Sequence, residues 1–222
     1  MPFSKLSQHG SHIVLIGDFN PKIFQPAWFG AQDLIRQSEV EDATIQIVSS
    51  EIVIFTLDWL RLEVTRERFS AGTTQDPYHP FIMELVLGTF RLLRHTPLRM
   101  MGINREAHYK MNSEERWHAI GHKLVPKKMW EGLLTKPGMA SLTVSGIRPD
   151  SHKGSILVTI EPSMQFRPGI YVRVNDHFES SLVQSASGAD EIIDILAANW
   201  KESYDRASGI ITKLMEEADN AQ

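Results

Sequence analysis

Residues 44–66 read TIQIVSSEIVIFTLDWLRLEVTR and decide the fold class of this chain. β-Branched and aromatic residues dominate three runs in this stretch, and such residues favour β-strands. The three runs span residues 44–48, 51–57 and 59–66. In the third run Leu60, Leu62 and Val64 alternate with polar residues, so one side of that strand faces a core and the other faces water. We therefore predict three strands of a largely antiparallel sheet, the last of which residues 69–73 extend.

Helical patterns stand on both sides of these strands. Residues 26–36 begin with a proline, which suits a first helical turn, and then carry apolar residues at helical spacing. Residues 80–95 repeat apolar side chains every three or four positions and stop before Thr96-Pro97. A strand rich in valine and isoleucine at residues 11–16 and a turn at residues 17–21 precede the first helix. The first half is thus predicted as strand, helix, three strands and helix.

The second half repeats this order. Its predicted elements are a strand at residues 98–103, a helix that Ser113 caps and that runs to residue 123, a short helical piece at residues 126–134, strands at residues 139–146, 154–161 and 169–175, and a long amphipathic helix at residues 189–218 after a small-residue linker at residues 180–188.

The agreement in order predicts an α+β protein made of two pseudo-repeats, residues 1–96 and residues 97–222, packed together with helices on one face of the sheets. The proposed counterparts are Gly17 and Asn20 with Gly102 and Asn104, and Trp28 with Trp117. This element order resembles the duplicated, saddle-shaped sheet of the TATA-binding-protein type. The resemblance concerns architecture only, because a fold does not determine a function.

Composition limits the classes of protein to which the chain can belong. Hydrophobic residues make up 42% and charged residues 23%, as in ordinary globular proteins. The apolar runs are far shorter than the roughly 20 residues of a membrane-spanning helix, and the first eleven residues lack the features of an export signal. The absence of cysteine excludes disulfides, thiol catalysis and cysteine-ligated metals, and fits a reducing compartment. We therefore expect a cytoplasmic protein without a membrane partner.

Charge is distributed unevenly along the chain. Residues 91–128 contain nine Lys and Arg against three acidic residues, a net +6, whereas the rest of the chain carries a net −10. If they share a surface, seven of these side chains would contact nucleic-acid phosphates, with Trp117 or Tyr109 stacking on bases. The seven are Arg91, Arg94, Arg99, Arg105, Lys123, Lys127 and Lys128. The alternative is a set of separate solvated faces.

Polar residues at predicted strand ends are the candidate ligand contacts. Asp18 and Asn20 lie in the turn-rich, aromatic stretch 17–29, where they either bind a ligand or stabilise the turn while the aromatic residues hold the first helix on the sheet. Asn104, His108 and His177 lie in the second half. A cleft that collects Asp18, Asn104, His108 and His177 would favour an enzyme.

Sequence patterns of known catalytic sites are missing. His118 and His122 have the i, i+4 spacing of a metal site, but Ala119 replaces the glutamate that zinc proteases place after the first histidine. The chain also lacks a Gly-x-Ser-x-Gly elbow, a phosphate-binding loop and a dinucleotide-binding fingerprint. We therefore predict no catalytic residue, no metal and no cofactor.

Five short stretches carry a resemblance to a family. They are residues 17–29, residues 69–74, residues 95–104, and Ile160-Glu161-Pro162-Ser163 together with Val174-Asn175-Asp176-His177. Over nearly the whole chain the sequence resembles a bacterial family of hypothetical proteins that has no assigned activity. More distantly it resembles a group scattered sporadically among bacterial genomes, a distribution that suits mobile-element or antiviral defence genes.

These observations favour a non-enzymatic interaction or scaffold protein, a subunit of a bacterial multi-protein assembly. Its partner is another protein or a second copy of the chain, and the long C-terminal helix packs across its own sheet or presents residues 210–215 to another chain. The alternative is nucleic-acid binding through residues 91–128. A third reading is an enzyme with an unrecognised site.

Overall fold

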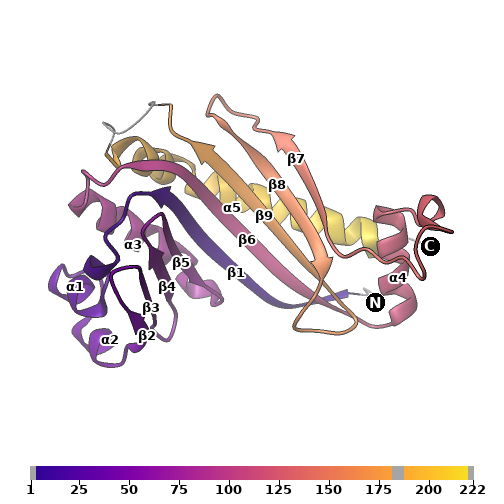
Figure 1. Cartoon of the computed structure of the whole chain (residues 1–222), viewed down its shortest axis with the longest axis horizontal. Helices are drawn as coiled ribbons and strands as arrows, with labels where there is room; N and C mark the ends of the chain where they lie inside the picture. Colours follow the sequence, from indigo (N-terminus) through magenta and orange to yellow (C-terminus); the bar gives the residue numbers. More distant parts are fainter. Residues whose placement is uncertain (1–3, 182–187, 220–222) are drawn as a thin grey trace.

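The computed structural model describes residues 4–181 and 188–219, which form a nine-stranded sheet and helices that pack on it (Figure 1). The strand order is β2-β3-β4-β5-β1-β6-β9-β8-β7, and every neighbouring pair is antiparallel. The strands are β1 Ser4–Gly17, β2 Thr44–Val48, β3 Ile52–Thr56, β4 Arg61–Thr65, β5 Arg68–Thr73, β6 Leu98–Met111, β7 Leu142–Ile147, β8 Gly154–Pro162 and β9 Gly169–Glu179. The predicted α+β class and largely antiparallel sheet are confirmed.

In residues 4–181 and 188–219, five α-helices and three short 3-10 helices connect and cover the strands. They are η1 Pro21–Ile23, α1 Pro26–Ala31, α2 Gln37–Glu41, η2 Asp76–Tyr78, α3 His79–Leu92, α4 Glu114–Leu124, η3 Lys128–Trp130 and α5 Asp190–Asp219. The predicted long C-terminal helix is α5, and the predicted cap of α4 is present, because the Ser113 hydroxyl accepts a hydrogen bond from the Arg116 N–H. Among the described residues, no helix combines the length and the apolar character needed to cross a membrane.

The two longest strands, β1 and β6, pair along the middle of the sheet. Their register runs from Ser4 opposite Met111 to Gly17 opposite Leu98. Because β1 belongs to residues 1–96 and β6 to residues 97–222, both segments contribute to one continuous sheet.

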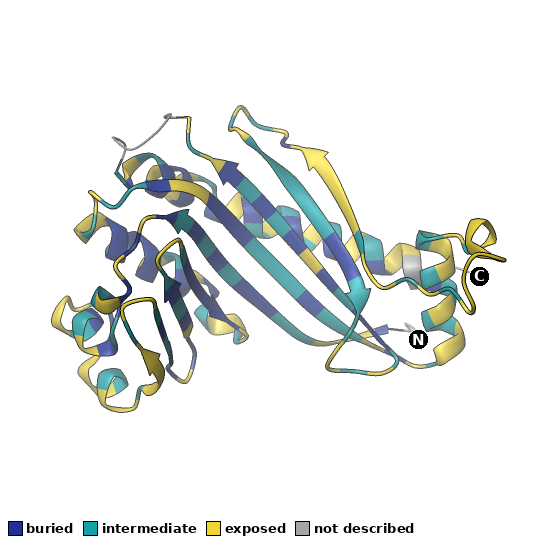
Figure 2. Ribbon diagram, viewed as in Figure 1, coloured by how far each residue is buried: buried dark blue, intermediate teal, exposed yellow. Residues whose placement is uncertain are grey.

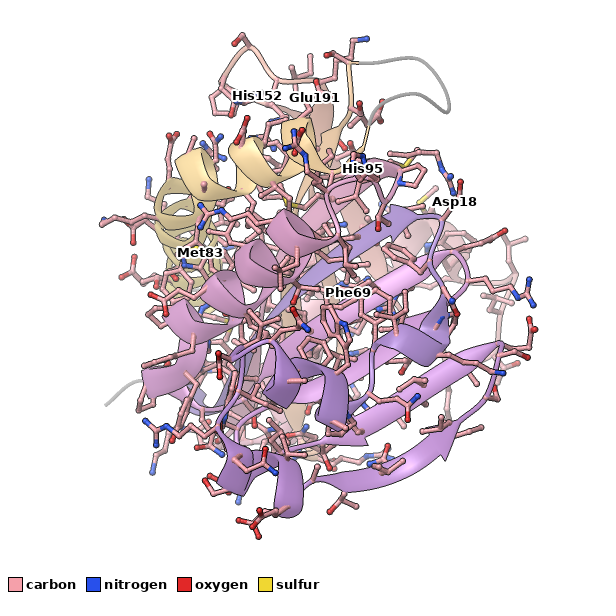
Figure 3. All side chains as sticks on the ribbon, turned by 90° about the vertical axis from the view of Figure 1, so that its left-hand side faces the viewer. Asp18, Phe69, Met83, His95, His152 and Glu191 are labelled. Atoms are coloured by element: carbon pink, nitrogen blue, oxygen red, sulfur yellow. The ribbon has the colours of Figure 1, made fainter. Side chains whose placement is uncertain are left out.

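Two apolar clusters hold the helices on the same face of this sheet. The first joins the sheet residues Ile13 and Phe69 to Phe90 of α3 and Leu196 of α5, all of them buried. Figure 3 shows Phe69 inside the molecule, between the sheet and the helices. The second cluster joins β6, β8 and β9 to α4 and to the second half of α5, including Ile211. Helix α5 therefore spans both clusters and lies behind the strands in Figure 1.

Two predicted elements of the first half differ from the structure. Residues 69–73 do not extend the preceding strand but form β5, because the Thr65 hydroxyl closes a tight turn by accepting the Arg68 N–H at 3.1 Å. Four strands, not three, therefore follow the first helices. The helix predicted at residues 26–36 ends at Ala31, since Asp33 has a φ of 56°, which an α-helix does not tolerate.

The second half differs in two places. The strand predicted at residues 98–103 continues to Met111, because β1 and β9 pair with it along its whole length. Gly102 and Asn104 therefore lie inside a strand, and their proposed correspondence with Gly17 and Asn20 is wrong. The helical piece at residues 126–134 is reduced to the single turn η3. Part of the predicted linker, residues 182–187, lies outside the described residues.

Candidate binding face of the sheet

The two faces of the central strands differ in chemistry. One face carries buried apolar residues under the helices, such as Ile13, Ile103 and Val174. Because side chains alternate along a strand, the residues between them point away from the helices. On the three central strands these open-face residues are His12, Val14 and Ile16 of β1, Met100, Gly102, Asn104, Glu106 and His108 of β6, and Tyr171, Arg173, Asn175, His177 and Glu179 of β9. Most are half-buried although no helix in the described part of the chain covers them, and Figure 2 shows the resulting bands of buried and intermediate residues.

A hollow of about 300 Å³ lies in the middle of this open face. Val14 and Met100 give it an apolar part, and Asn104, Asn175 and His177 give it hydrogen-bonding groups. Its other lining residues are Ile16, Met101, Gly102 and Arg173. The hollow is therefore amphipathic and suits a group with both apolar and polar surface.

Glycine at position 102 creates the room for the two asparagines. A Cβ atom there would lie 2.7 Å from Asn175 Oδ1 and 3.1 Å from Asn104 Nδ2. Asn104 Nδ2 donates to the Gly102 carbonyl at 3.1 Å, but the buried Asn175 Oδ1 accepts no hydrogen bond from the described part of the chain. Leaving such an acceptor unsatisfied costs about 1–3 kcal/mol. The hollow thus offers an acceptor that a bound N–H or O–H group would satisfy.

A hydrogen-bonded cluster centred on Glu106 lies beside the hollow. Its Oε1 contacts His12 Nε2 at 3.0 Å, and its Oε2 accepts from the Tyr171 hydroxyl at 2.8 Å. Burial by itself raises the pKa of the Glu106 carboxyl, but the hydrogen bonds and charge of its neighbours outweigh it and hold the pKa at about 2. Burial and the adjacent carboxylate raise the pKa of Tyr171. Glu106 therefore stays ionised and acts as an acceptor for its two neighbours.

His108 adds a contact that superficially resembles a catalytic pair. Its Nδ1 lies 2.9 Å from Ser163 Oγ, and burial lowers the pKa of its imidazole. The same Ser163 oxygen accepts the backbone N–H groups of Gln165 and Phe166 at 3.1 and 3.2 Å. An oxygen occupied by two donors stabilises a turn and is poorly placed to attack a substrate, so the geometry favours a structural role for Ser163.

The stretch at residues 17–29 lies at the margin of the molecule. Asp18 is exposed at the edge of the molecule (Figure 3) and pairs with Arg99 Nη1 at 2.7 Å. Asn20 is exposed and precedes η1 without a side-chain capping hydrogen bond. Phe24 and Phe29 of the same stretch are buried in the first apolar cluster. The aromatic residues thus hold α1 on the sheet, and the two polar residues stay outside the hollow.

The candidate cleft of four residues is therefore only partly formed. Asn104 and His177 line the same hollow, and His108 lies further along the open face of β6. Asp18 is absent from this group because it lies beyond the end of β1 and pairs with Arg99. The alternation of polar residues with Val172 and Val174 in β9 was a signal in the sequence that could have identified this face.

The basic segment does not form one patch. Helices α3 and α4, which delimit it, lie at opposite ends of the molecule (Figure 1). Ion pairs neutralise three of its members, because Arg94 contacts Asp190, Arg99 contacts Asp18 and Lys123 contacts Glu217. Of the remaining four, Arg91 is exposed on α3, Lys127 and Lys128 lie at η3, and Arg105 points to the helices.

Sequence reasoning missed a polar cluster on the helix side. The two oxygens of Asp76 contact His9 Nε2 at 2.9 Å and His79 Nε2 at 2.8 Å, so the three side chains offer ligand atoms for a metal ion. Arg105 Nη1, however, lies 3.0 Å from His79 Nε2 and its guanidinium stacks on Tyr204. Burial and this positive charge lower the pKa of His79. A cation would meet Arg105, so the geometry favours an internal polar network. His118 and His122 are both exposed on α4.

No protein-family model matches this sequence, and no curated protein matches it either. The geometry of the open face is therefore the basis for the functional assignment.

Proposed function

We propose that this chain is a non-enzymatic interaction protein that receives a protein partner on the open face of its sheet, as a subunit of a bacterial multi-protein assembly. The observation that carries the proposal is the one-sided packing of the helices, which leaves an amphipathic hollow uncovered on the central strands. Tyrosine and arginine are enriched where proteins meet, and Tyr171 and Arg173 both lie on this face.

The charge of the open face supports a protein partner more than a nucleic acid. Its basic side chains are Lys5, Arg61, Arg68, Lys110 and Arg173, and its acidic side chains are Glu63, Glu106, Glu161 and Glu179. The two signs nearly balance, whereas a face that follows a phosphate backbone carries a clear excess of Lys and Arg. The alternative of nucleic-acid binding through residues 91–128 has no continuous surface to support it.

We also propose that the chain arose by duplication of one unit. The proposal is based on the resemblance of the element order to the duplicated sheet of the TATA-binding-protein type. In each half a long central strand precedes helices, a run of strands and a covering helix. The sheet order supports this, since β5 and β9, the last strands of the two halves, flank β1 and β6 on opposite sides. The second half would then have lost one strand.

Site-directed photo-crosslinking tests the proposed partner face. A photoreactive phenylalanine analogue at position 173 reports on the open face, and the same analogue at position 202, on the exposed side of α5, is the matched control. We expect a protein adduct from position 173 in cells and none from position 202. The adduct is then identified by mass spectrometry, and binding of the purified partner is measured by calorimetry.

Charge reversal then decides whether the contact is specific. Arg173→Glu should weaken binding of the purified partner at least tenfold while the circular dichroism spectrum stays unchanged, because Arg173 is exposed and its substitution leaves no cavity. Unchanged affinity in this variant and in Asn175→Leu would overturn the proposal. Retention of nucleic acid on a filter at low and moderate salt would support the alternative instead.

A further inference from the structure

A second concavity, remote from the open-face hollow, lies at the end of the molecule that carries α4 (Figure 1). Trp117, Ile120 and Gly121 of α4 line one side of it, and Met139 and Ile170 line other parts of its wall. Its volume is about 690 Å³. Ligand pockets in proteins measure roughly 300–1,000 Å³, so the cavity has the size of a small-molecule site.

The floor of this cavity is part of the folded core. Ile120 and Ile170 are each only 3% exposed and belong to the second apolar cluster, against which Trp117 and Met139 also pack. An apolar group of a ligand would therefore meet a preformed apolar wall, which limits the entropic cost of binding. The wall suits an acyl chain or an aromatic ring.

The cavity contains a buried cation that has no partner among the described residues. Lys127 lines it, and its Nζ is buried without a hydrogen bond to any residue in the described ranges. A buried ammonium without a partner is strongly unfavourable. An anionic ligand that forms an ion pair with this ammonium would therefore be stabilised by it. Three carboxylates, Glu115, Glu131 and Glu161, also line the cavity, but none of them forms an ion pair with Lys127 in the described ranges, and Glu161 accepts from the Ser141 hydroxyl at 3.0 Å.

We propose that this cavity binds an amphipathic carboxylate, whose acyl chain packs against Trp117, Ile120 and Ile170 and whose carboxylate pairs with the Lys127 ammonium. This site is separate from the proposed partner face, and either assignment can fail without the other.

Gly121 provides a way to close the cavity without disturbing the fold. It lies inside α4, and a Cβ atom at this position would meet no heavy atom within 4 Å. Glycine inside a helix is less favourable than alanine, because its unfolded chain loses more conformational freedom. A larger residue there should therefore occupy the cavity while it strengthens the helix.

Calorimetric titration with decanoate, below its micellar concentration, tests the proposal, with decanol as the uncharged probe. We expect one saturable decanoate site and at least tenfold weaker binding of decanol. Lys127→Met keeps an unbranched side chain of nearly the same length without the charge, and should bring the affinities for decanoate and decanol together. Lys128→Met, which changes the neighbouring exposed lysine, should behave as the wild type. Gly121→Leu should abolish binding of both probes.

Four results would overturn the proposal. Equal affinities of decanoate and decanol for the wild type, or wild-type behaviour of Lys127→Met, would exclude the ion pair. Undiminished binding to Gly121→Leu would place the probe elsewhere. Because Met129, Leu133 and Leu134 of the same segment are exposed, sedimentation with phosphatidylcholine–phosphatidylglycerol vesicles is the third arm. Vesicle binding without a saturable decanoate site would assign this segment to a lipid surface instead.

Discussion

At the scale of single residues, Asp176 has the most demanding environment. It is 1% exposed on the helix-facing side of β9, where it contacts Arg148 and, at 2.6 Å, Arg206 Nη1. Arg148 also contacts Asp150 at 2.6 Å and stacks on Phe178 with its guanidinium 3.6 Å from the ring centre. The network joins β9 to α5 and to the loop after β7. Each buried charge is therefore stabilised by the opposite charges of the other members.

Replacing Asp176 with asparagine should destabilise the fold by about 3–5 kcal/mol, because it leaves two arginines without their shared carboxylate in a buried site. Urea denaturation followed by circular dichroism measures the loss. Glu202→Gln is the matched control: Glu202 contacts the same Arg206 but is exposed, and its removal should change stability by less than about 0.5 kcal/mol. A similar small loss in both variants would contradict the account.

Glu106 should make the stability of the protein depend on acid pH. Its pKa falls from an ordinary value of 4.5 to about 2 in the fold. A depressed carboxyl pKa stabilises the fold above the unfolded value, and the contribution disappears as pH falls from 4.5 towards 2. Glu106→Gln should therefore cost about 1–3 kcal/mol at pH 7.

The pH dependence of the difference is the decisive measurement for Glu106. Urea denaturation of the wild type and of Glu106→Gln at several pH values should show the two stabilities converging between pH 4.5 and pH 2. A difference that stays constant over this range would show that the loss comes from packing and not from the ionised carboxylate.

At the scale of elements, α5 was predictable and β6 was not. The apolar residues of α5 recur every three or four positions, and this local pattern is sufficient to identify a helix. Strand β6 mixes Arg105, Glu106 and Lys110 with small and apolar residues, so its second half shows no strand pattern. Pairing with β1 and β9 makes it a strand, and no local signal encodes those partners.

A glycine inside α5 gives a test of how this helix is stabilised. Gly209 is exposed, and a Cβ atom there would meet nothing within 4 Å. Gly209→Ala should raise the free energy of unfolding by about 0.5–1 kcal/mol, because alanine reduces the entropy of the unfolded chain and favours the helix. Thermal and urea denaturation both measure the gain.

The opposite result is expected at a glycine in the sheet. At Gly72 of β5 an added Cβ atom would lie 2.0 Å from His12 Nδ1, so Gly72→Ala should destabilise the protein. If Gly72→Ala and Gly209→Ala changed the free energy of unfolding in the same direction, the space around the added Cβ atom would not be what decides the effect at these two positions.

At the scale of the whole molecule, the sheet has two open edges. The outer strand β2 exposes Ile45 and Ile47, and the opposite outer strand β7 exposes Val144 and Ile147. Figure 2 shows both outer strands as largely exposed. Exposed apolar edges favour pairing with another strand, and charged residues prevent it. The distal half of α5 is not available for such contacts, because Ile211 is buried against its own sheet.

We therefore expect the wild type to self-associate at high concentration and the double variant Ile45→Lys, Ile47→Lys to do so less. Multi-angle light scattering over a concentration series measures the change. Val144→Lys serves as the comparison for the other edge and shows which strand dominates. Identical masses for all three proteins over the series would exclude edge pairing as a route to self-association.

The sequence by itself determined the α+β class and the packing of helices on one face of the sheet. The reason is that the spacing of apolar residues in 44–66, 80–95 and 189–218 directly reflects which side of each element is buried. Only the tertiary structure decided which strands pair, how β6 extends, and which charges meet. His12 and Glu106, 94 positions apart, illustrate the reason. A local pattern encodes which side of an element is buried, whereas the partner of a polar group depends on contacts between distant segments, which the pairing of β1 with β6 creates.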